Sequence, residues 1–266
     1  MRKMSIVCVM VMCLAMSGFS SLLSREGYWE RLKTHDKKEF DRFQEIFNDP
    51  VQLKERFEKN LLVYPHISGK EMIEFKQVFG ISDEVMRSIL MDIIREVSAK
   101  NGWQWENPKF LKEIDIANMQ LHWAICWLEV CADADAKQFL MDIATDTKKG
   151  DVYRRTAAFT YLRCSNAQET RDALTCFFAD DMRAVVCPVY GPYNAAIEAY
   201  DKAESDLLKR EAIVTSLTAA LAKEENEKLF IYADKLLTKR SKAYAESPQR
   251  KAALQRFDTP TAKETP

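Results

Sequence analysis

The sequence predicts an all-α protein made of stacked helical hairpins, arranged either as a solenoid or as an irregular helical bundle. Three observations support this fold class. Apolar residues recur at spacings of three and four along most of the chain, which is the periodicity of amphipathic helices. The chain has only 7 glycines, whereas many-stranded folds use glycine at turns and bulges. A segment with a helix-like pattern also occurs twice in the sequence.

The first predicted helices follow one another between residues 36 and 101. We expect helices over Asp36–Phe47, from Pro50 until Pro65, over Ser68–Phe79 and over Ser82–Asn101, each bounded by a capping or helix-breaking residue. Gly80 and Gly102 follow the last two helices, where glycine commonly ends a helix. The expected apolar faces are Phe40, Phe43 and Phe47; Leu53, Phe57, Leu61 and Leu62; and Val85, Ile89, Ile93 and Val97.

The repeated phrase is MQLHWAICWLEVC at Met119–Cys131 and VYRRTAAFTYLRC at Val152–Cys164. Aligning Ala124 with Ala158 gives an offset of 34, with no gap through residues 146 and 180. The second half of each copy has apolar residues at i, i+3, i+4, i+7 and i+8, so each copy reads as a helical hairpin. These residues are Ala136, Phe139, Leu140, Ile143 and Ala144, and Thr170, Ala173, Leu174, Phe177 and Phe178.

A single hairpin cannot bury its apolar face, but stacked hairpins can. Burial of each large apolar side chain stabilises the stack by about 1.5–3 kcal/mol.

The segment DVYRRTAAFTYL at Asp151–Leu162 resembles the first helix of a HEAT-type repeat. The matching residues are Asp151, Tyr153, Arg154, Ala157, Ala158 and Leu162, although Tyr153 stands where valine is usual and no proline precedes the helix. The upstream copy, with Met119 and Gln120 at the equivalent positions, matches poorly. The resemblance covers about 60 residues and implies a protein-binding surface, with enzymes rare among such folds.

Beyond Asp180 the 34-residue register is lost. A connector with Pro188, Gly191 and Pro192 precedes one long or two abutting helices over residues 193–222, and an amphipathic helix covers 225–244. The predicted organisation is a signal peptide at 1–17, an N-terminal helical region at 25–116, a HEAT-like repeat region at 117–246 and a disordered tail at 247–266.

The N-terminus has the layout of a secretory signal. Arg2 and Lys3 precede an apolar run, and Ala15-Met16-Ser17 has small residues at the positions read by signal peptidase. This predicts export to the periplasm or the extracellular space. The uncharged stretch from Met4 to Ser24 is also long enough to anchor an uncleaved chain in a membrane.

Charge, cysteine content and the absence of known motifs argue against a nucleic-acid partner, a disulfide framework and a cofactor. The 39 basic and 40 acidic residues nearly cancel and form no basic stripe, so we expect no nucleic-acid partner. Five cysteines would remain after removal of Cys8 and Cys13, and they suggest no disulfide framework. No cofactor-binding motif is present, and no cofactor is predicted.

The expected function is a non-catalytic scaffold or binding module for another protein. The candidate surface is the repeat region, residues 118–180. We expect Arg154→Glu and Arg155→Glu to weaken partner binding without unfolding the chain. Six residues are candidate binding residues: Trp103, Trp105, Arg154, Arg155, Tyr190 and Tyr193.

Catalytic alternatives remain open, but their residues are not identified. His122 and Cys126 are four apart on a predicted helix and could share a metal or form a base–nucleophile pair, although packing between helices explains them more simply and no metal site is predicted. Glu198, Asp201, Glu204 and Asp206 form an acidic patch that reads as a solvated face. The alternative function is an envelope hydrolase acting on polysaccharide or peptide, with Trp103 and Trp105 as a stacking platform and unidentified catalytic carboxylates.

Overall fold

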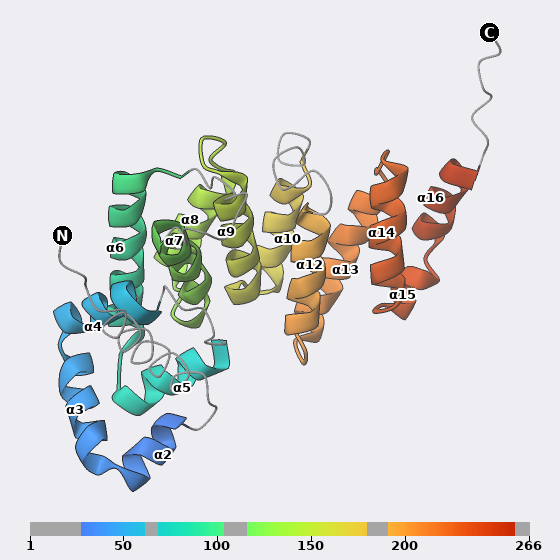
Figure 1. Ribbon diagram of the computed structural model, residues 1–266. Helices are drawn as coiled ribbons and strands as arrows, with labels where there is room; N and C mark the ends of the chain where they lie inside the picture. The colour runs from blue at the N-terminus through green and yellow to red at the C-terminus, as the bar shows by residue number, and fades with distance from the viewer. Residues whose placement is uncertain (1–27, 62–68, 104–115, 180–190, 259–266) are drawn as a thin grey trace, which may run out of the picture. The chain divides into compact units, whose positions relative to one another are not determined.

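The computed structural model describes residues 28–61, 69–103, 116–179 and 191–258, and within these ranges the chain is helical with no β-strand (Figure 1). None of the described helices is both long and apolar enough to cross a membrane. The predicted signal segment lies outside the described residues. The chain divides into two compact units between Phe139 and Leu140, whereas the sequence suggested a boundary at 116/117. The reason for this shift is that α7 (Ile116–Trp127) packs along α6 (Asp83–Asn101) and so belongs with the N-terminal helices.

The first unit contains helices whose ends follow the local signals in the sequence. Asp36 accepts a hydrogen bond from Glu39 N (3.1 Å), Asp49 accepts one from Val51 N (2.9 Å), and Ser82 accepts one from Val85 N (3.2 Å). Gly80 and Gly102 have φ of +67° and +76°, in the left-handed region that favours glycine. The remaining elements are α2 (Tyr28–His35), α3 (Lys37–Asn48), α4 (Pro50–Arg56), a π-helical turn (Phe57–Leu61), α5 (Gly69–Phe79) and a 3₁₀ turn (Leu128–Val130).

An aromatic cluster forms the core of this unit. The ring of Trp29 on α2 lies 5.5 Å from Phe43, 6.1 Å from Phe47, 5.6 Å from Phe75 and 4.9 Å from Phe79, mostly in edge-to-face contacts. Such pairs add stability beyond the area they bury. The cluster therefore holds α2, α3 and α5 together.

The buried face of α6 is wider than its periodicity predicted. Ile89 and Ile93 are buried as expected, but Val85 and Val97 are only half-buried. The helix contacts both α4 and α7, so it needs an apolar face for two partners. The additional buried residues are Met86, Leu90 and Ile94.

The second unit contains further helical hairpins. Of the two alternatives for residues 193–222, one long helix or two helices, the structure has two helices. Residues 248–258, which the sequence assigned to a disordered tail, form another helix. Ser247 accepts a hydrogen bond from Arg250 N (3.2 Å) at the start of that helix, and Ala253 on it is buried. The elements are α8 (Ala134–Thr145, which crosses the division between units), α9 (Asp151–Cys164), α10 (Ala167–Phe177), α12 (Gly191–Lys202), α13 (Leu207–Leu221), α14 (Glu227–Thr238), α15 (Lys242–Ala245) and α16 (Pro248–Asp258).

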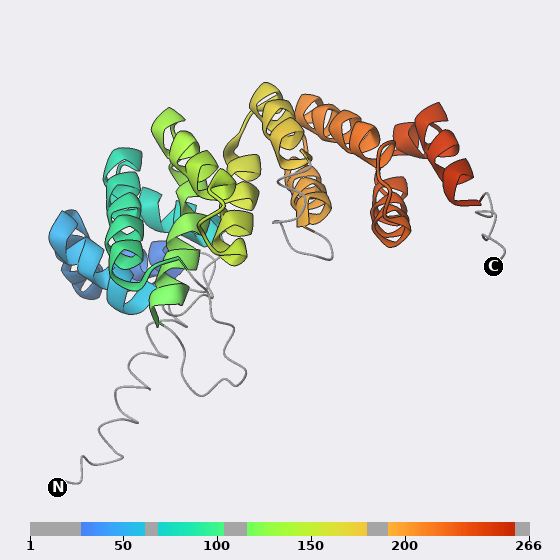
Figure 2. The ribbon, with the colours of Figure 1, turned by 90° about the horizontal axis from the view of Figure 1, so that it is seen from above.

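Helices in this unit pack against the corresponding helix of the next hairpin in the chain. Helix α9 contacts α12 and α10 contacts α13, while α12 also contacts α14 and α13 contacts α16 (Figures 1 and 2). The first helix of each hairpin therefore packs against the first helix of the next hairpin. The second helix of each packs against the second helix of the next. This is the arrangement expected when hairpins bury their apolar faces by stacking.

Cations from later helices bind the C-terminal carbonyl groups of some of these helices. Lys209 on α13 is 5% exposed, and its Nζ donates to the carbonyl oxygens of Arg163 (3.1 Å) and Ser165 (2.7 Å) at the end of α9. Arg256 on α16 donates to the carbonyl oxygens of Leu221 (3.2 Å) and Glu224 (3.4 Å) at the end of α13. Since the last carbonyls of a helix have no intrahelical donor and carry partial negative charge, a cation stabilises them.

We expect Lys209→Met to lower the free energy of unfolding by about 2 kcal/mol, because it leaves two buried carbonyl oxygens without their donor. Thermal unfolding followed by circular dichroism measures the effect. Lys202→Met is the matched control, because Lys202 is exposed on α12 and its replacement removes the same charge. Equal melting temperatures for the two variants would show that the Lys209 cap does not stabilise the unit.

Candidate functional site

A cleft lies between α10 and α13 in the second unit. Its volume is about 900 Å³, within the range of ligand-binding sites. Both walls come from the second helices of consecutive hairpins, which lie next to each other in Figure 2. The lining residues are Arg171, Leu174, Thr175, Phe178 and Ala179 from α10 and the residues just after it, and Thr215, Ser216, Ala219, Ala220, Lys223 and Glu225 from α13 and the turn that follows.

The two walls run parallel. Lys209 is in the first turn of α13, and its Nζ binds the carbonyl of Ser165, which lies just before α10 begins at Ala167. The starts of α10 and α13 are therefore adjacent, and the helices contact each other beyond that point. As a result Arg171 lies toward the N-terminal end of the cleft, and Lys223 lies at its C-terminal end.

The exposed surface of both walls lacks charge between these ends. Thr175 and Ala179 are exposed on one wall, and Thr215 and Ala219 on the other. An exposed helix face normally carries charged residues, but no charged residue occurs in 173–179 or in 212–222. These uncharged stretches are the sequence signal that could have identified the cleft, and the periodicity analysis did not use it.

A buried tyrosine packs against Phe178 in the wall of the cleft. The ring of Phe178 lies 5.1 Å from that of Tyr193 on α12, and Tyr193 is 3% exposed. Its hydroxyl donates to Glu224 Oε2 (2.6 Å), and Glu224 is itself buried and accepts from Asn226 N (3.0 Å). Tyr193 was expected to present a binding surface, but its burial makes it a support for the cleft wall instead.

Arg154 is also a correction to the sequence-based expectation. It is 1% exposed, and its Nε donates to the carbonyl of Ala144 (3.0 Å) at the C-terminal end of α8. The guanidinium is therefore a buried cap, like Lys209, and it is not available to a partner. Arg154→Glu would place a carboxylate against carbonyl oxygens, so the expectation that this change leaves the fold intact does not hold.

The other candidate binding residues are dispersed. Arg155, next to Arg154 on α9, is half-exposed, and Trp103 is half-buried just after α6 in the first unit. Trp105 and Tyr190 lie outside the described residues. The structure therefore gathers none of the six candidates into one exposed cluster among the residues it describes. Of the expected surface at 118–180, the part that lines the cleft is Arg171–Ala179.

The polar alternatives take part in packing. Cys126 Sγ lies 3.8 Å from His122 Nε2 on α7, and the described residues contain no group of three metal-ligating side chains. Two carboxylates of the acidic patch pair with arginines of neighbouring helices: Glu198 with Arg163 (3.0 Å) and Asp201 with Arg240 (2.7 Å).

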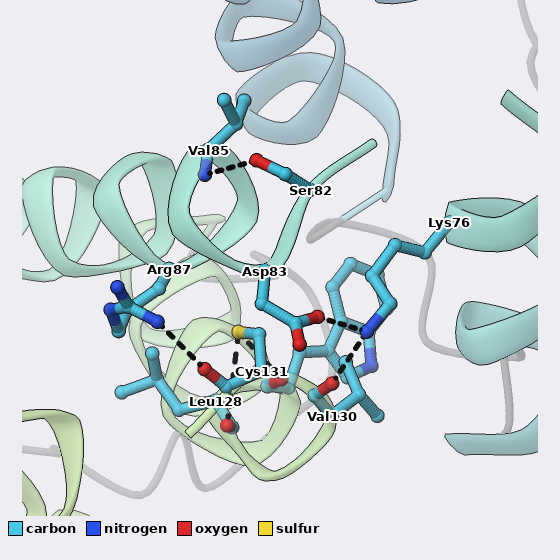
Figure 3. A network of polar contacts seen from close by, with 9 residues as sticks. Lys76, Ser82, Asp83, Val85, Arg87, Leu128, Val130 and Cys131 are labelled. Atoms are coloured by element: carbon cyan, nitrogen blue, oxygen red, sulfur yellow. Dashed lines mark hydrogen bonds and ion pairs between the residues drawn. The ribbon is translucent and has the colours of Figure 1, made fainter. Parts of the chain in front are cut away.

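A polar network in the first unit joins three elements (Figure 3). Lys76 on α5 pairs with Asp83 on α6 and donates to the carbonyl of Val130 (2.9 Å), while Arg87 donates to the carbonyl of Cys131 (3.3 Å). Burial of the Cys131 thiol beside this network raises its pKa to about 12, because the thiolate would lose its hydration. The network is a structural junction with a protonated thiol at its centre.

No protein-family model, curated protein or solved structure matches this chain.

Arg154→Ala should reduce the free energy of unfolding by about 3 kcal/mol, since it leaves a cavity and an unsatisfied carbonyl. Arg155→Ala is the neighbouring control and should cost less than about 1 kcal/mol. Thermal melts of the two variants measure the difference. Arg154→Met should fall between them, because methionine refills the volume without supplying a donor. A melting temperature for Arg154→Ala that equals that of Arg155→Ala would contradict the buried cap.

Cys131 should resist alkylation in the folded protein. A thiol with a pKa of about 12 is roughly one part in ten thousand thiolate at pH 8, against about a quarter for an ordinary cysteine. Iodoacetamide labelling read by peptide mass spectrometry should modify the half-exposed Cys164 before Cys131, and should reach Cys131 only in urea. Modification of both at the same rate in the native protein would show that Cys131 is accessible.

Proposed function

We propose that this chain is an exported, non-catalytic binding module built on HEAT-like helical repeats, and that the α10–α13 cleft binds a segment of a partner protein. The observation that carries the proposal is the cleft itself, because its exposed walls carry hydroxyl and methyl groups where exposed helices normally carry charge. Such a surface loses little hydration free energy when a partner covers it.

The packing of the second unit supports the repeat-based interpretation. Stacked hairpins present their second helices side by side, and α10 and α13 form such a pair. The resemblance of residues 151–162 to a HEAT-type helix falls on α9, the first helix of the same hairpin. Export is proposed from the N-terminal sequence, with membrane attachment only where that segment stays uncleaved.

The hydrolase alternative would require catalytic carboxylates at the cleft. Among the described residues that line it, one is a carboxylate, Glu225. Hydrolysis of a glycosidic bond commonly uses a pair of carboxylates on opposite sides of the scissile bond. The binding function therefore has more support at this surface than the hydrolase does.

Site-specific photo-crosslinking tests the proposal. The full chain is produced in its own cells with benzoylphenylalanine at Thr215, in the middle of the cleft, or at Ala252, an exposed control position on α16. We expect irradiation to give a protein adduct from position 215 and none of that mass from position 252. Mass spectrometry identifies the adduct. Adding Ala219→Trp should remove it, because the indole narrows the cleft beside position 215. An adduct that forms equally at both positions, or that contains glycan instead of protein, would overturn the proposal.

A further inference from the structure

The two cations of the cleft determine what kind of segment it can hold. The described lining contains Arg171, Lys223 and one carboxylate, Glu225, so positive charge predominates. Arg171 makes one long hydrogen bond to Gln168 Oε1 (3.4 Å), and neither it nor Lys223 forms an ion pair with a described residue. Both cations are exposed and can bind an incoming carboxylate.

The separation of these cations argues against a single compact anion. The parallel walls place Arg171 toward one end and Lys223 at the other. At the helical rise, eight residues span about 12 Å, which is the length of lining from 171 to 179 on one wall and from 215 to 223 on the other. A single phosphate or sulfate group would contact both cations only with both long side chains turned inward from the ends of the cleft. An extended peptide covers the same length with about four residues.

The middle of the cleft matches a peptide backbone with an apolar side chain. Phe178 is half-buried and lies with the buried Leu174 on one wall, where an apolar side chain could pack. The hydroxyls of Thr175, Thr215 and Ser216 line the same stretch. Because the Thr175 hydroxyl already donates to the carbonyl of Arg171 (2.9 Å), its remaining lone pair is suited to accept from a peptide N–H.

We infer that the partner segment is acidic: an extended stretch of about four residues with carboxylates that bind Arg171 and Lys223 and an apolar side chain that packs on Leu174 and Phe178. This inference rests on the proposed function and adds the chemistry of the partner. The Arg171 end is the more favourable for a carboxylate, because Glu225, the one carboxylate of the described lining, lies at the Lys223 end.

Peptide display tests the inference on the full-length mature chain. A library of random heptapeptides is selected on the wild-type protein, and peptides are kept whose binding falls at least tenfold with Ala219→Trp, which narrows the cleft without changing its charge, but not with the control Ala252→Trp. We expect the retained peptides to be enriched in Asp and Glu on both sides of an apolar residue. Their affinity should fall at least tenfold with Arg171→Glu, fall less with Lys223→Glu, and weaken as salt is raised.

Two controls make the charge effect specific. Lys228→Glu reverses an exposed charge on α14, outside the cleft lining, and should leave the retained peptides bound. The double variant Arg171→Glu, Lys223→Glu should select basic peptides. Circular dichroism verifies that each variant melts near the wild type, and Thr175→Trp replaces Ala219→Trp if the latter is unstable.

The outcomes separate this inference from the proposed function. If peptides require the open cleft but show no acidic enrichment, the inference fails and the binding function stands. If no peptide distinguishes Ala219→Trp from Ala252→Trp, peptide binding at the cleft fails, and the inference fails with it. If sedimentation shows that Ala219→Trp dissociates an oligomer of the wild-type chain, the occupant is a second copy and the acidic-segment inference is overturned.

Discussion

The second unit depends on cations that bind the carbonyl groups at the C-termini of three of its helices. A glycine in the left-handed conformation often ends a helix and satisfies these carbonyls, but among the described glycines only Gly80 and Gly102 adopt it, both in the first unit. In the second unit Arg154, Lys209 and Arg256 supply the missing donors from a different helix. Each such contact therefore satisfies carbonyl groups at the end of one helix and joins that helix to a later one. The same hydrogen bonds contribute to helix capping and to helix packing.

Local chemistry made much of the fold predictable. Capping by Ser82 and termination at Gly80 and Gly102 depend on residues only a few positions apart, and the structure confirms them. The exceptions depend on distant contacts. Arg154 was interpreted as a surface residue because arginine is rarely buried, and its partner carbonyl lies in the preceding helix. Helix α16 was missed because its polar sequence gives little periodicity, although Arg256 on it binds the end of α13.

The candidate site was only partly accessible from the sequence. The sequence contains the uncharged stretches 173–179 and 212–222, which indicate two helix surfaces without charge. The sequence does not show that these two surfaces face each other. That arrangement depends on the stacking of hairpins and on the contact from Lys209 to Ser165, 44 positions away. Tyr193 illustrates the same limit. An aromatic residue near a proline suggests an exposed binding residue, yet the packing of α12 places Tyr193 against Phe178.

The direction of the caps in the second unit has a consequence for the order of assembly. Arg154 follows Ala144 in the chain, Lys209 follows Arg163 and Ser165, and Arg256 follows Leu221, so each of these helix ends receives its cation from a later segment. During synthesis, which proceeds from the N-terminus, the ends of α8, α9 and α13 therefore lack these cationic donors until α9, α13 and α16, respectively, have been made.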